Sequence, residues 1–231
     1  IFIFGLPRSG TTLVENIISS HNQVSSVGEI NFLNRFFRLN FYKKNQINLK
    51  NVNDFLNLNL QKEYFNYLKS FNLTNNIITD KSLNIYFNLG FIKHFFPECK
   101  FIHCYRNAKD NCLSIYKNLF NDDVGWKYNE KDIVDYYYLY NDIMNFWDKK
   151  FKKDILNIKY ENLINDKNIL IKNIIKYCDL DWDENCLHHQ KNNAPIKTLS
   201  FNQANKPIYS SSINSSKKFE NYLKNMFDKL K

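Results

Sequence analysis

Short apolar runs alternate along this chain with longer segments in which apolar residues recur every three or four positions. Runs such as residues 1–4 and 101–105 are typical of buried strands in a parallel sheet, because both faces of such a sheet are covered. Segments such as residues 11–20 carry one apolar stripe and predict helices. The pattern predicts strands at 1–4, 77–79, 101–105 and 155–159, and helices at 11–20, 32–41, 55–71, 83–96, 108–119, 131–151, within 160–178 and at about 217–230.

Strands that alternate with helices predict an α/β fold with a parallel sheet flanked by helices. The length of 231 residues and the hydrophobic content of 44% allow one sizeable core. We therefore expect a single domain over residues 1–231, with an irregular segment rich in Ser and Asn at 195–216. Because the chain opens directly on a predicted strand, we also expect upstream sequence to be missing.

The chain carries a formal net charge of +9 at pH 7. A basic excess favours anionic ligands, so nucleic acid, an anionic membrane or a small polyanion would each fit. The basic residues are scattered, however, as on an ordinary solvated surface. Charge alone therefore chooses none of these partners.

The cysteines and the hydrophobic runs indicate the cellular compartment of the chain. None of the five cysteines forms a C-x-x-C pair, which argues against a zinc ribbon and predicts reduced thiols, although a Cys178–Cys186 bridge stays open. No apolar run reaches the length of a membrane span, and no signal peptide is visible. These features predict a cytoplasmic protein without a membrane segment or a metal site.

The candidate chemistry starts with the glycine-rich turn after the first predicted strand. Gly5 and Gly10 have the spacing of a Walker A loop, but Thr11 stands where a nucleotide triphosphatase carries lysine. The cation of this loop is Arg8. Backbone N–H groups of such a loop, together with the N-terminus of the next helix, bind phosphate. Three hydroxyl groups can add hydrogen bonds: those of Ser9, Thr11 and Thr12.

A magnesium-binding partner for this loop is not evident in the sequence. A Walker B segment would be an apolar strand that ends in aspartate, and the nearest candidate, Asp80, is followed at once by Lys81. We therefore expect the loop to bind a single terminal phosphate without metal, rather than a triphosphate.

Residues 7–13, Pro-Arg-Ser-Gly-Thr-Thr-Leu, resemble the 5′-phosphosulfate-binding loop of sulfotransferases. These enzymes use 3′-phosphoadenosine-5′-phosphosulfate (PAPS) as donor and release 3′,5′-bisphosphoadenosine (PAP). The resemblance is closer to the branch that includes tyrosylprotein sulfotransferases and bacterial tetratricopeptide-linked sulfotransferases. It implies a P-loop-containing, nucleotide-transferase-like fold of three layers. The similar segments are the loop, 28–29, 79–81, 104–116 and 198–209.

The resemblance implies a second phosphate site, for the 3′-phosphate of the donor, at Arg106 and Ser114. Arg106 follows a predicted strand, so its guanidinium can reach the crevice at the end of the sheet and offer two parallel donors. Ser114 lies two turns into the following helix, on the same side. An ordinary surface ion pair between Arg106 and Asp110 is the competing interpretation.

The resemblance also implies the groups that carry out the transfer. Glu29 corresponds to the catalytic glutamate and is the candidate general base, with a first-turn helix carboxylate as the competing interpretation. Lys81 and Arg8 are the candidates for stabilising the transferred group and the leaving oxygen, because fixed cations stabilise developing charge in a dry site. Arg35 matches an arginine on the acceptor side of the family's site.

Two further positions resemble nucleotide contacts of the family: Tyr160, at the end of the last predicted strand, and Ser200, in the late loop. A core aromatic residue with a satisfied hydroxyl is the competing interpretation for Tyr160. The family commonly has a basic residue followed by Trp where this chain has Ser215 and Ser216, with Lys217 and a second lysine just beyond. Either these lysines replace the lost cation, or the chain binds its donor more weakly.

The leading interpretation is PAPS-dependent sulfuryl transfer to an acceptor hydroxyl, without metal or nucleic acid. The acceptor class stays open among protein tyrosine, a glycan and a small molecule, and so does a homodimer. Two alternatives also stay open: an ATP-dependent, kinase-like P-loop transferase, and a non-catalytic module that binds anions or sulfated glycans.

Overall fold

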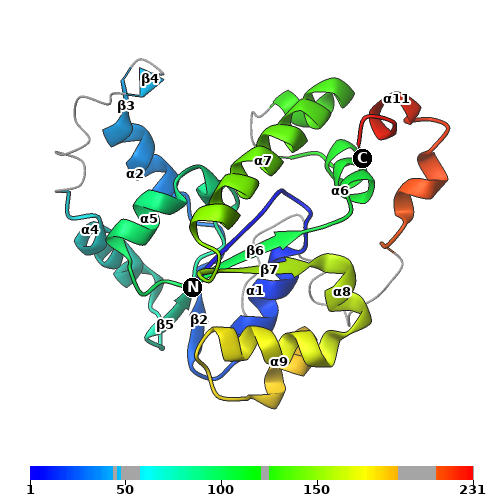
Figure 1. Ribbon diagram of the computed structural model, residues 1–231. Helices are drawn as coiled ribbons and strands as arrows, with labels where there is room; N and C mark the ends of the chain where they lie inside the picture. The colour runs from blue at the N-terminus through cyan, green and yellow to red at the C-terminus, as the bar shows by residue number, and fades with distance from the viewer. Residues whose placement is uncertain (44–45, 48–57, 121–124, 192–211, 231) are drawn as a thin grey trace.

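The computed structural model describes residues 1–43, 46–47, 58–120, 125–191 and 212–230 (Figure 1). Within these residues, a parallel sheet is covered by helices on both faces, which makes three layers. Figure 1 shows α1 (Thr11–Ser19) and α9 (Lys167–Tyr177) below the sheet and α7 (Glu130–Lys150) above it. The predicted α/β class is confirmed.

The central strand of the sheet is β1 (Phe2–Phe4), which pairs in parallel with β6 (Phe101–Tyr105). In this pairing Ile3 lies opposite Ile102. On its other side, β6 pairs in parallel with β7 (Ile155–Lys159). These three strands form one flank of the sheet.

On the opposite flank, β2 (Val24–Ser26) and β5 (Ile77–Thr79) form a second parallel pair. Asp80 joins this pair to β1, because Ile3 N donates to Asp80 O and Asp80 N donates to Ile1 O, each at 2.9 Å. The lateral order is therefore β2-β5-β1-β6-β7. After β1 the chain forms β2 and β5 on one side of this strand, and later β6 and β7 on its other side. The carboxyl end of β1 is therefore a topological switch point, and ligands bind at such points in parallel sheets.

Alternate residues of the buried strands face opposite layers. Phe2 and Phe4 join the hydrophobic core that includes α7, whereas Ile3 between them joins the core that includes α1. Phe101 and Ile102 divide between the two cores in the same way. Because both faces are covered, these strands read as continuous apolar runs in the sequence.

The hydrophobic pattern misses β2. Val24 is the buried apolar residue of this strand, and Ser25 and Ser26 follow it, so no apolar run marks the strand. Its conformation depends on the pairing with β5, where Val24 lies opposite Ile77.

The predicted final helix at about 217–230 is wrong. Ser215–Phe219 form a 3-10 helix, η6, and Lys224–Phe227 form the short helix α11. Burial begins at Leu223, and residues 217–222 are exposed. The large apolar residues of the first half, Phe219 and Tyr222, are exposed, so they do not hold a helix against the core.

Of the other predicted helices, the one at 32–41 is present with the predicted ends, and the rest are present with shifted ends or breaks. The helix predicted at 83–96 divides into a 3-10 helix and α5, the segment 160–178 divides into α8 and α9, and part of the helix predicted at 55–71 lies outside the described residues. The remaining elements are α2 (Phe32–Phe41), β3 (Tyr42–Lys43), β4 (Gln46–Ile47), α4 (Leu60–Leu68), η2 (Lys69–Phe71), η3 (Leu83–Phe87), α5 (Leu89–Phe95), α6 (Ala108–Tyr116), η4 (Gly125–Tyr128), α8 (Tyr160–Asn165) and η5 (Glu184–Lys191).

Candidate active site

The predicted site residues follow the carboxyl ends of the five parallel strands. The loop 5–10 follows β1, Glu29 comes shortly after β2, and Lys81 comes shortly after β5. Arg106 follows β6 directly, and Tyr160 follows β7 directly. The carboxyl ends of parallel strands share one edge of a sheet, so the topology brings these distant positions together.

Two glycines allow the loop to approach its neighbours closely. A Cβ atom at Gly5 would overlap the carbonyl oxygen of Cys104 in β6, and one at Gly10 would lie 2.7 Å from Cδ2 of Tyr160. Gly10 has a φ of 101° and Arg8 a φ of 68°, both in the left-handed region. The glycine spacing thus reflects a loop that is pressed between β6 and the start of α8.

The loop contains a buried hydroxyl without a hydrogen bond. The Oγ atom of Ser9 has no partner among the described residues. Thr11 and Thr12 are buried beside it in the first turn of α1, where backbone N–H groups lack partners in the helix. Buried polar groups are normally paired, so the unpaired hydroxyl fits a loop that binds an anion. Asn111 of α6 holds the loop from the other side by donating to the Pro7 carbonyl at 2.8 Å.

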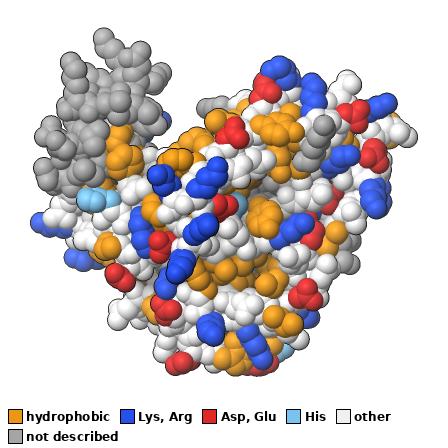
Figure 2. Space-filling view, in the orientation of Figure 1, with side chains coloured by type: hydrophobic (Ala, Val, Ile, Leu, Met, Phe, Trp, Pro, Cys, Tyr) orange, Lys and Arg blue, Asp and Glu red, His pale blue; other side chains and the backbone are white. Residues whose placement is uncertain are grey.

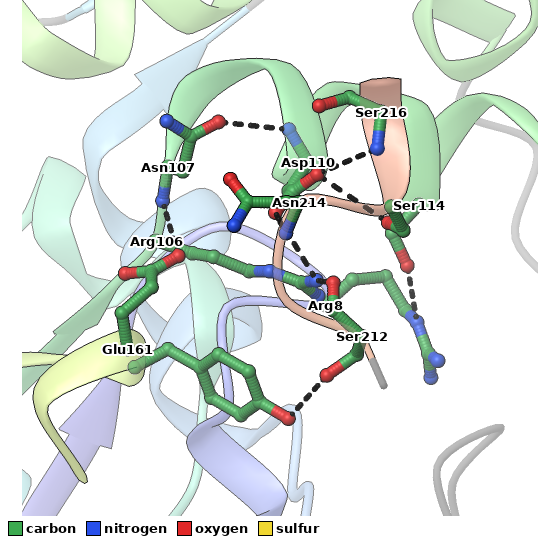
Figure 3. A network of polar contacts seen from close by, with 11 residues as sticks. Arg8, Arg106, Asn107, Asp110, Ser114, Glu161, Ser212, Asn214 and Ser216 are labelled. Carbon is green, nitrogen blue, oxygen red and sulfur yellow. Dashed lines mark hydrogen bonds and ion pairs between the residues drawn. The ribbon is translucent and has the colours of Figure 1, made fainter. Parts of the chain in front are cut away.

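A hydrogen bond joins the loop to the second predicted phosphate site (Figure 3): Arg8 Nε donates to Ser114 Oγ at 3.2 Å. Nearby, the guanidinium of Arg106 lies 4.8 Å from the centre of the Tyr160 ring, and its Nη2 donates to the carbonyl of Ser212. The Nε of Arg106 is buried and has no partner in the described part of the chain. This N–H group of Arg106 is therefore not satisfied by any described residue.

Asp110 ties the C-terminal segment 212–216 to α6 beside Arg106 (Figure 3). Its carboxylate accepts from Asn214 N at 2.7 Å and from Ser216 N at 2.8 Å. The same carboxylate lies 3.9 Å from Arg106 Nη2, and both side chains are buried. The Arg106–Asp110 pair of the competing interpretation is thus present, but it is not a surface pair.

Tyr160 also belongs to this network, because its hydroxyl forms a hydrogen bond of 2.8 Å with Ser212 Oγ. The next residue, Glu161, accepts from Asn107 N at 2.9 Å, and Asn107 caps α6 by accepting from Asp110 N at 3.2 Å. These contacts fix the ends of β6 and β7 relative to each other. Tyr160 therefore lines the same network as Arg106 rather than the hydrophobic core.

Glu29 and Lys81 form an ion pair at the other side of the loop. The backbone ladder of β2 and β5 extends one step further, because Lys81 N donates to Gly28 O at 3.0 Å. This step places the two side chains together, and Lys81 Nζ donates to Glu29 Oε1. The Lys81 side chain is 0% exposed, whereas that of Glu29 is 41% exposed. The pair therefore has a buried cation and a carboxylate that solvent and a substrate can reach.

A second carboxylate near Lys81, that of Glu15, is not among the site residues predicted from the sequence. Glu15 of α1 is buried, and its Oε2 lies 3.9 Å from Lys81 Nζ. Burial raises the pKa of Glu15 to about 7, although Lys81 and a hydrogen bond from Ser26 oppose the shift. The sequence signal for it is a charged residue beside the buried positions Val14 and Ile18 of α1.

Asp80, the nearest approach to a Walker B aspartate, is engaged by the scaffold. Its carboxylate accepts from Tyr64 Oη at 2.8 Å and from Ser82 Oγ at 2.6 Å. Burial raises the pKa of Asp80 to about 6, against the effect of these two hydrogen bonds. Both oxygens of the carboxylate therefore help to connect β5 with its surroundings.

The remaining predicted elements of the site are Arg35, Ser200 with its segment, and the two lysines that follow Ser216. Arg35 lies exposed on α2, and no polar contact among the described residues joins its side chain to the others. Ser200 and the segment 198–209 lie outside the described residues. Lys217 and Lys218 are exposed on η6, while Ser216 before them is buried against Asp110.

The described surface on the face shown in Figure 2 carries charges of both signs. On this face, Lys and Arg side chains are interspersed with Asp and Glu.

Within the described ranges, no three or more His, Cys, Asp or Glu side chains are grouped so that they could hold a metal ion. No described helix is both long and apolar enough to span a bilayer. All five cysteines lie in the described part and are unbridged thiols, so the Cys178–Cys186 bridge is absent.

The fold is similar to solved structures of sulfotransferases. The sulfotransferase domain of the olefin synthase from Synechococcus PCC 7002 has a TM-score of 0.66 at 18% identity, and the match covers 98% of this chain and 93% of that one. The sulfotransferase domain from the curacin biosynthetic pathway has a TM-score of 0.58 at 15% identity, covering 96% of each chain. Mouse sulfotransferase SULT7A1, solved in complex with PAP, has a TM-score of 0.53 at 15% identity, covering 100% of this chain and 83% of that one. These similarities establish the fold.

Sequence comparison establishes the family. The model of the sulfotransferase family matches residues 1–184, and this chain belongs to that family. An uncharacterized protein of Aquifex aeolicus is 30% identical over 96% of this chain and 31% of its own length. Protein-tyrosine sulfotransferase A of Caenorhabditis elegans is 23% identical over 83% of this chain and 52% of its own length. The chain thus spans about a third to a half of the length of these relatives.

Proposed function

We propose that this chain transfers a sulfuryl group from PAPS to an acceptor hydroxyl. The observation that carries the proposal is the Arg8–Ser114 hydrogen bond, which joins the two predicted anion sites, with the Lys81–Glu29 ion pair at the same edge of the sheet. PAPS carries its anionic groups at the 5′ and 3′ positions, so a protein that binds it needs two such sites. Membership of the sulfotransferase family supports this proposal.

Two of the buried polar atoms that have no hydrogen-bond partner among the described residues fit this donor. Ser9 Oγ lies in the loop that would hold the 5′-phosphosulfate, and Arg106 Nε lies in the site for the 3′-phosphate. Ser114 would share the 3′-phosphate with Arg106, while Tyr160 and Ser200 would contact the nucleotide. When bound, PAPS supplies an activated sulfuryl group, and we expect no metal to take part. The proposed loop ligands are Arg8, Ser9, Gly10, Thr11 and Thr12.

Glu29 would accept the proton of the acceptor hydroxyl. Its carboxylate is partly exposed, as a base that meets a substrate has to be. Lys81 and Arg8 would stabilise the negative charge that develops on the transferred group and on the leaving oxygen, since fixed cations need no reorganisation at the moment of reaction. Arg35 would lie on the acceptor side and favour an acidic acceptor.

For the acceptor we propose only its reacting group, a hydroxyl. The similarity to a protein-tyrosine sulfotransferase favours tyrosine in a protein, and a glycan or a small molecule are the other candidates. Acceptor pockets vary among proteins of one fold, so the donor site is the better target for a first test.

Calorimetric titration of the purified chain with PAP in the presence of EDTA tests donor binding. We expect micromolar affinity or better without Mg²⁺, and weaker binding of ADP, which lacks the 3′-phosphate. Absence of PAP binding, combined with Mg²⁺-dependent ATP hydrolysis, would instead support a kinase-like transferase. Tight binding of a sulfated glycan, again without PAP binding, would support a non-catalytic module.

Transfer of labelled sulfate from PAPS to a tyrosine peptide with acidic flanks, an unsulfated glycan and p-nitrophenol tests the reaction. Glu29→Gln should reduce turnover by about 100-fold or more, because it removes the base, while PAP affinity stays within about twofold. Glu63→Gln, on the exposed first turn of α4, is the matched control. Loss of PAP binding in Glu29→Gln would show that Glu29 has a structural role.

A further inference from the structure

Lys81 lies between two carboxylates that come from different elements. Glu29 follows β2 and is partly exposed, whereas Glu15 belongs to α1 and its side chain is 7% exposed. Lys81 Nζ donates to Glu29 Oε1 and lies 3.9 Å from Glu15 Oε2. A single buried ammonium group thus faces the candidate base on one side and a buried carboxylate on the other.

We propose that Glu15 is a positioning residue for the reaction: it holds the Lys81 ammonium from behind and balances its charge while Glu29 takes the proton of the acceptor. This inference rests on the proposed function, since it assigns a role within the same transfer. Glu15 itself forms and breaks no covalent bond. The proton of the acceptor hydroxyl passes to Glu29, and Lys81 keeps its own protons.

The change of charge at Glu29 is the reason that a second carboxylate beside Lys81 favours the reaction. Before proton transfer, the ionised Glu29 balances the buried Lys81. Once Glu29 is protonated, it is neutral, and the buried ammonium group loses the charge of the carboxylate to which it donates. Loss of an opposite charge beside a buried cation is unfavourable, so a second carboxylate that faces Lys81 favours the proton transfer. Glu15 is in place to supply that charge.

Glu15 is held so that one oxygen remains available to Lys81. Ser26 of β2 donates from its Oγ to Glu15 Oε1 at 2.8 Å, and Oε2 is the atom that faces the ammonium group. The charged side chains that act on Glu15 are Lys81, which lowers its pKa, and Asp80 and Glu29, which raise it. With burial, these groups place the pKa of Glu15 at about 7, so its charge responds to the state of its neighbours near neutral pH.

The coupling between Glu15 and Lys81 can be measured without turnover. ¹³C NMR of the carboxyl carbon of Glu15, in the chain without ligand, should give a midpoint near pH 7 in the wild type. Lys81→Met should raise this midpoint, because it removes the cation that favours the ionised form, and Glu29→Gln should lower it, because it removes a like charge. An unchanged Glu15 midpoint in Lys81→Met would overturn the inference whatever the activity.

Glu15→Gln tests the role in the reaction, since it keeps the size of the side chain and an acceptor for Ser26 but removes the charge. We expect kcat to fall by about 10-fold or more near pH 7 with acceptor KM and PAP affinity nearly unchanged. The matched control is again Glu63→Gln. A purely structural role would lower thermal stability and PAP binding together without a selective loss of kcat, and that outcome would overturn the inference.

A second variant keeps the inference testable if Glu15→Gln does not fold. Glu15→Asp retains the charge but withdraws it from Lys81 by one methylene, so kcat should again fall at unchanged PAP affinity. If the wild type transfers sulfate and both variants match its kcat, the role of Glu15 is refuted while the proposed function stands. If the wild type binds no PAP and transfers no sulfate, the proposed function fails, and with it this role.

Discussion

Two buried cations lie on either side of the loop 5–10, and their partners differ. Lys81 comes after β5 and faces the carboxylates of Glu29 and Glu15. Arg106 comes after β6 and interacts with a backbone carbonyl and an aromatic ring, with a carboxylate at 3.9 Å. The two positions are related by the sheet, because β5 and β6 are the neighbours of β1.

The difference indicates a division of labour. Lys81 contacts Glu29, the proposed base, so its position suits a step in which a proton moves and negative charge develops. Arg106 is fixed by the segment 212–216 and α6, and its Nε has no partner among the described residues, so its position suits a constant anion. A guanidinium also offers several donors in one plane, which an ammonium group does not.

If Lys81 serves the chemical step, its replacement should have the largest effect on turnover. Lys81→Met keeps a long side chain in the buried position and removes the charge. We expect transfer of labelled sulfate to fall by about 1,000-fold, while PAP affinity measured by calorimetry changes by less than about threefold. The control is Lys93→Met, which removes a partly exposed lysine that pairs with Asp154 at 3.3 Å. A parallel loss of PAP affinity would remove the distinction between the two cations.

If Arg106 anchors the donor, its replacement should act on binding. Arg106→Ala should weaken PAP binding by about 100-fold, because it removes a buried, charge-assisted donor. Arg106→Lys, which keeps the charge but loses the planar fork, should lie between this variant and the wild type. Arg38→Ala, at an exposed position of α2, is the control. Equal PAP affinity in Arg106→Ala and the wild type would refute the 3′-phosphate site.

The smallest expected effect concerns stability on the Lys81 side. In the folded chain the pKa of Glu15 is about 7, above the ordinary value of 4.5, so the folded state binds this proton more tightly than the unfolded state. The free energy of unfolding should therefore fall as the pH rises from about 4.5 to about 7, and this contribution should be constant above that range. The pKa of Asp80 is also raised, to about 6, so its carboxyl adds a further fall in the free energy of unfolding at lower pH.

Urea denaturation of the wild type and Glu15→Gln at about pH 5 and about pH 8 isolates the part that belongs to Glu15. We expect the wild type to lose about 2–3 kcal/mol more than the variant over this interval. Identical losses in the two proteins would mean that the Glu15 carboxyl does not titrate in this range.

Local patterns predicted much of the fold and several of the residues that the structure brings together around the loop 5–10. The strand, glycine turn and helix of residues 1–20 are contiguous, so their order in the sequence already predicts a phosphate loop. Arg106 and Tyr160 follow strands with clear apolar runs, and the structure places both in one network. The structure also joins Arg8 to Ser114 and Lys81 to Glu29, although the roles of these residues in catalysis stay predictions.

Other features had no local signal. β2 is too poor in apolar residues to be predicted. The final helix was predicted too long because the apolar residues within 217–222 are exposed, and burial in this segment starts only at Leu223. Glu15 looks in the sequence like an ordinary helix residue, since its burial depends on the strands and helices that surround α1. The partners of Asp110 at Asn214 and Ser216 lie about 100 residues further along the chain, beyond the reach of periodicity.

The sequence by itself determined the class of fold, the glycine-rich turn between the first strand and the first helix, and the positions at strand ends where charged residues stand. These are properties of short segments, which depend on backbone conformation and on the alternation of apolar residues. Only the tertiary structure decided which charges meet: the two carboxylates around Lys81, and the segment that holds Arg106. Such contacts follow from the lateral order of the strands and from burial, because burial removes the water that would otherwise separate the charges.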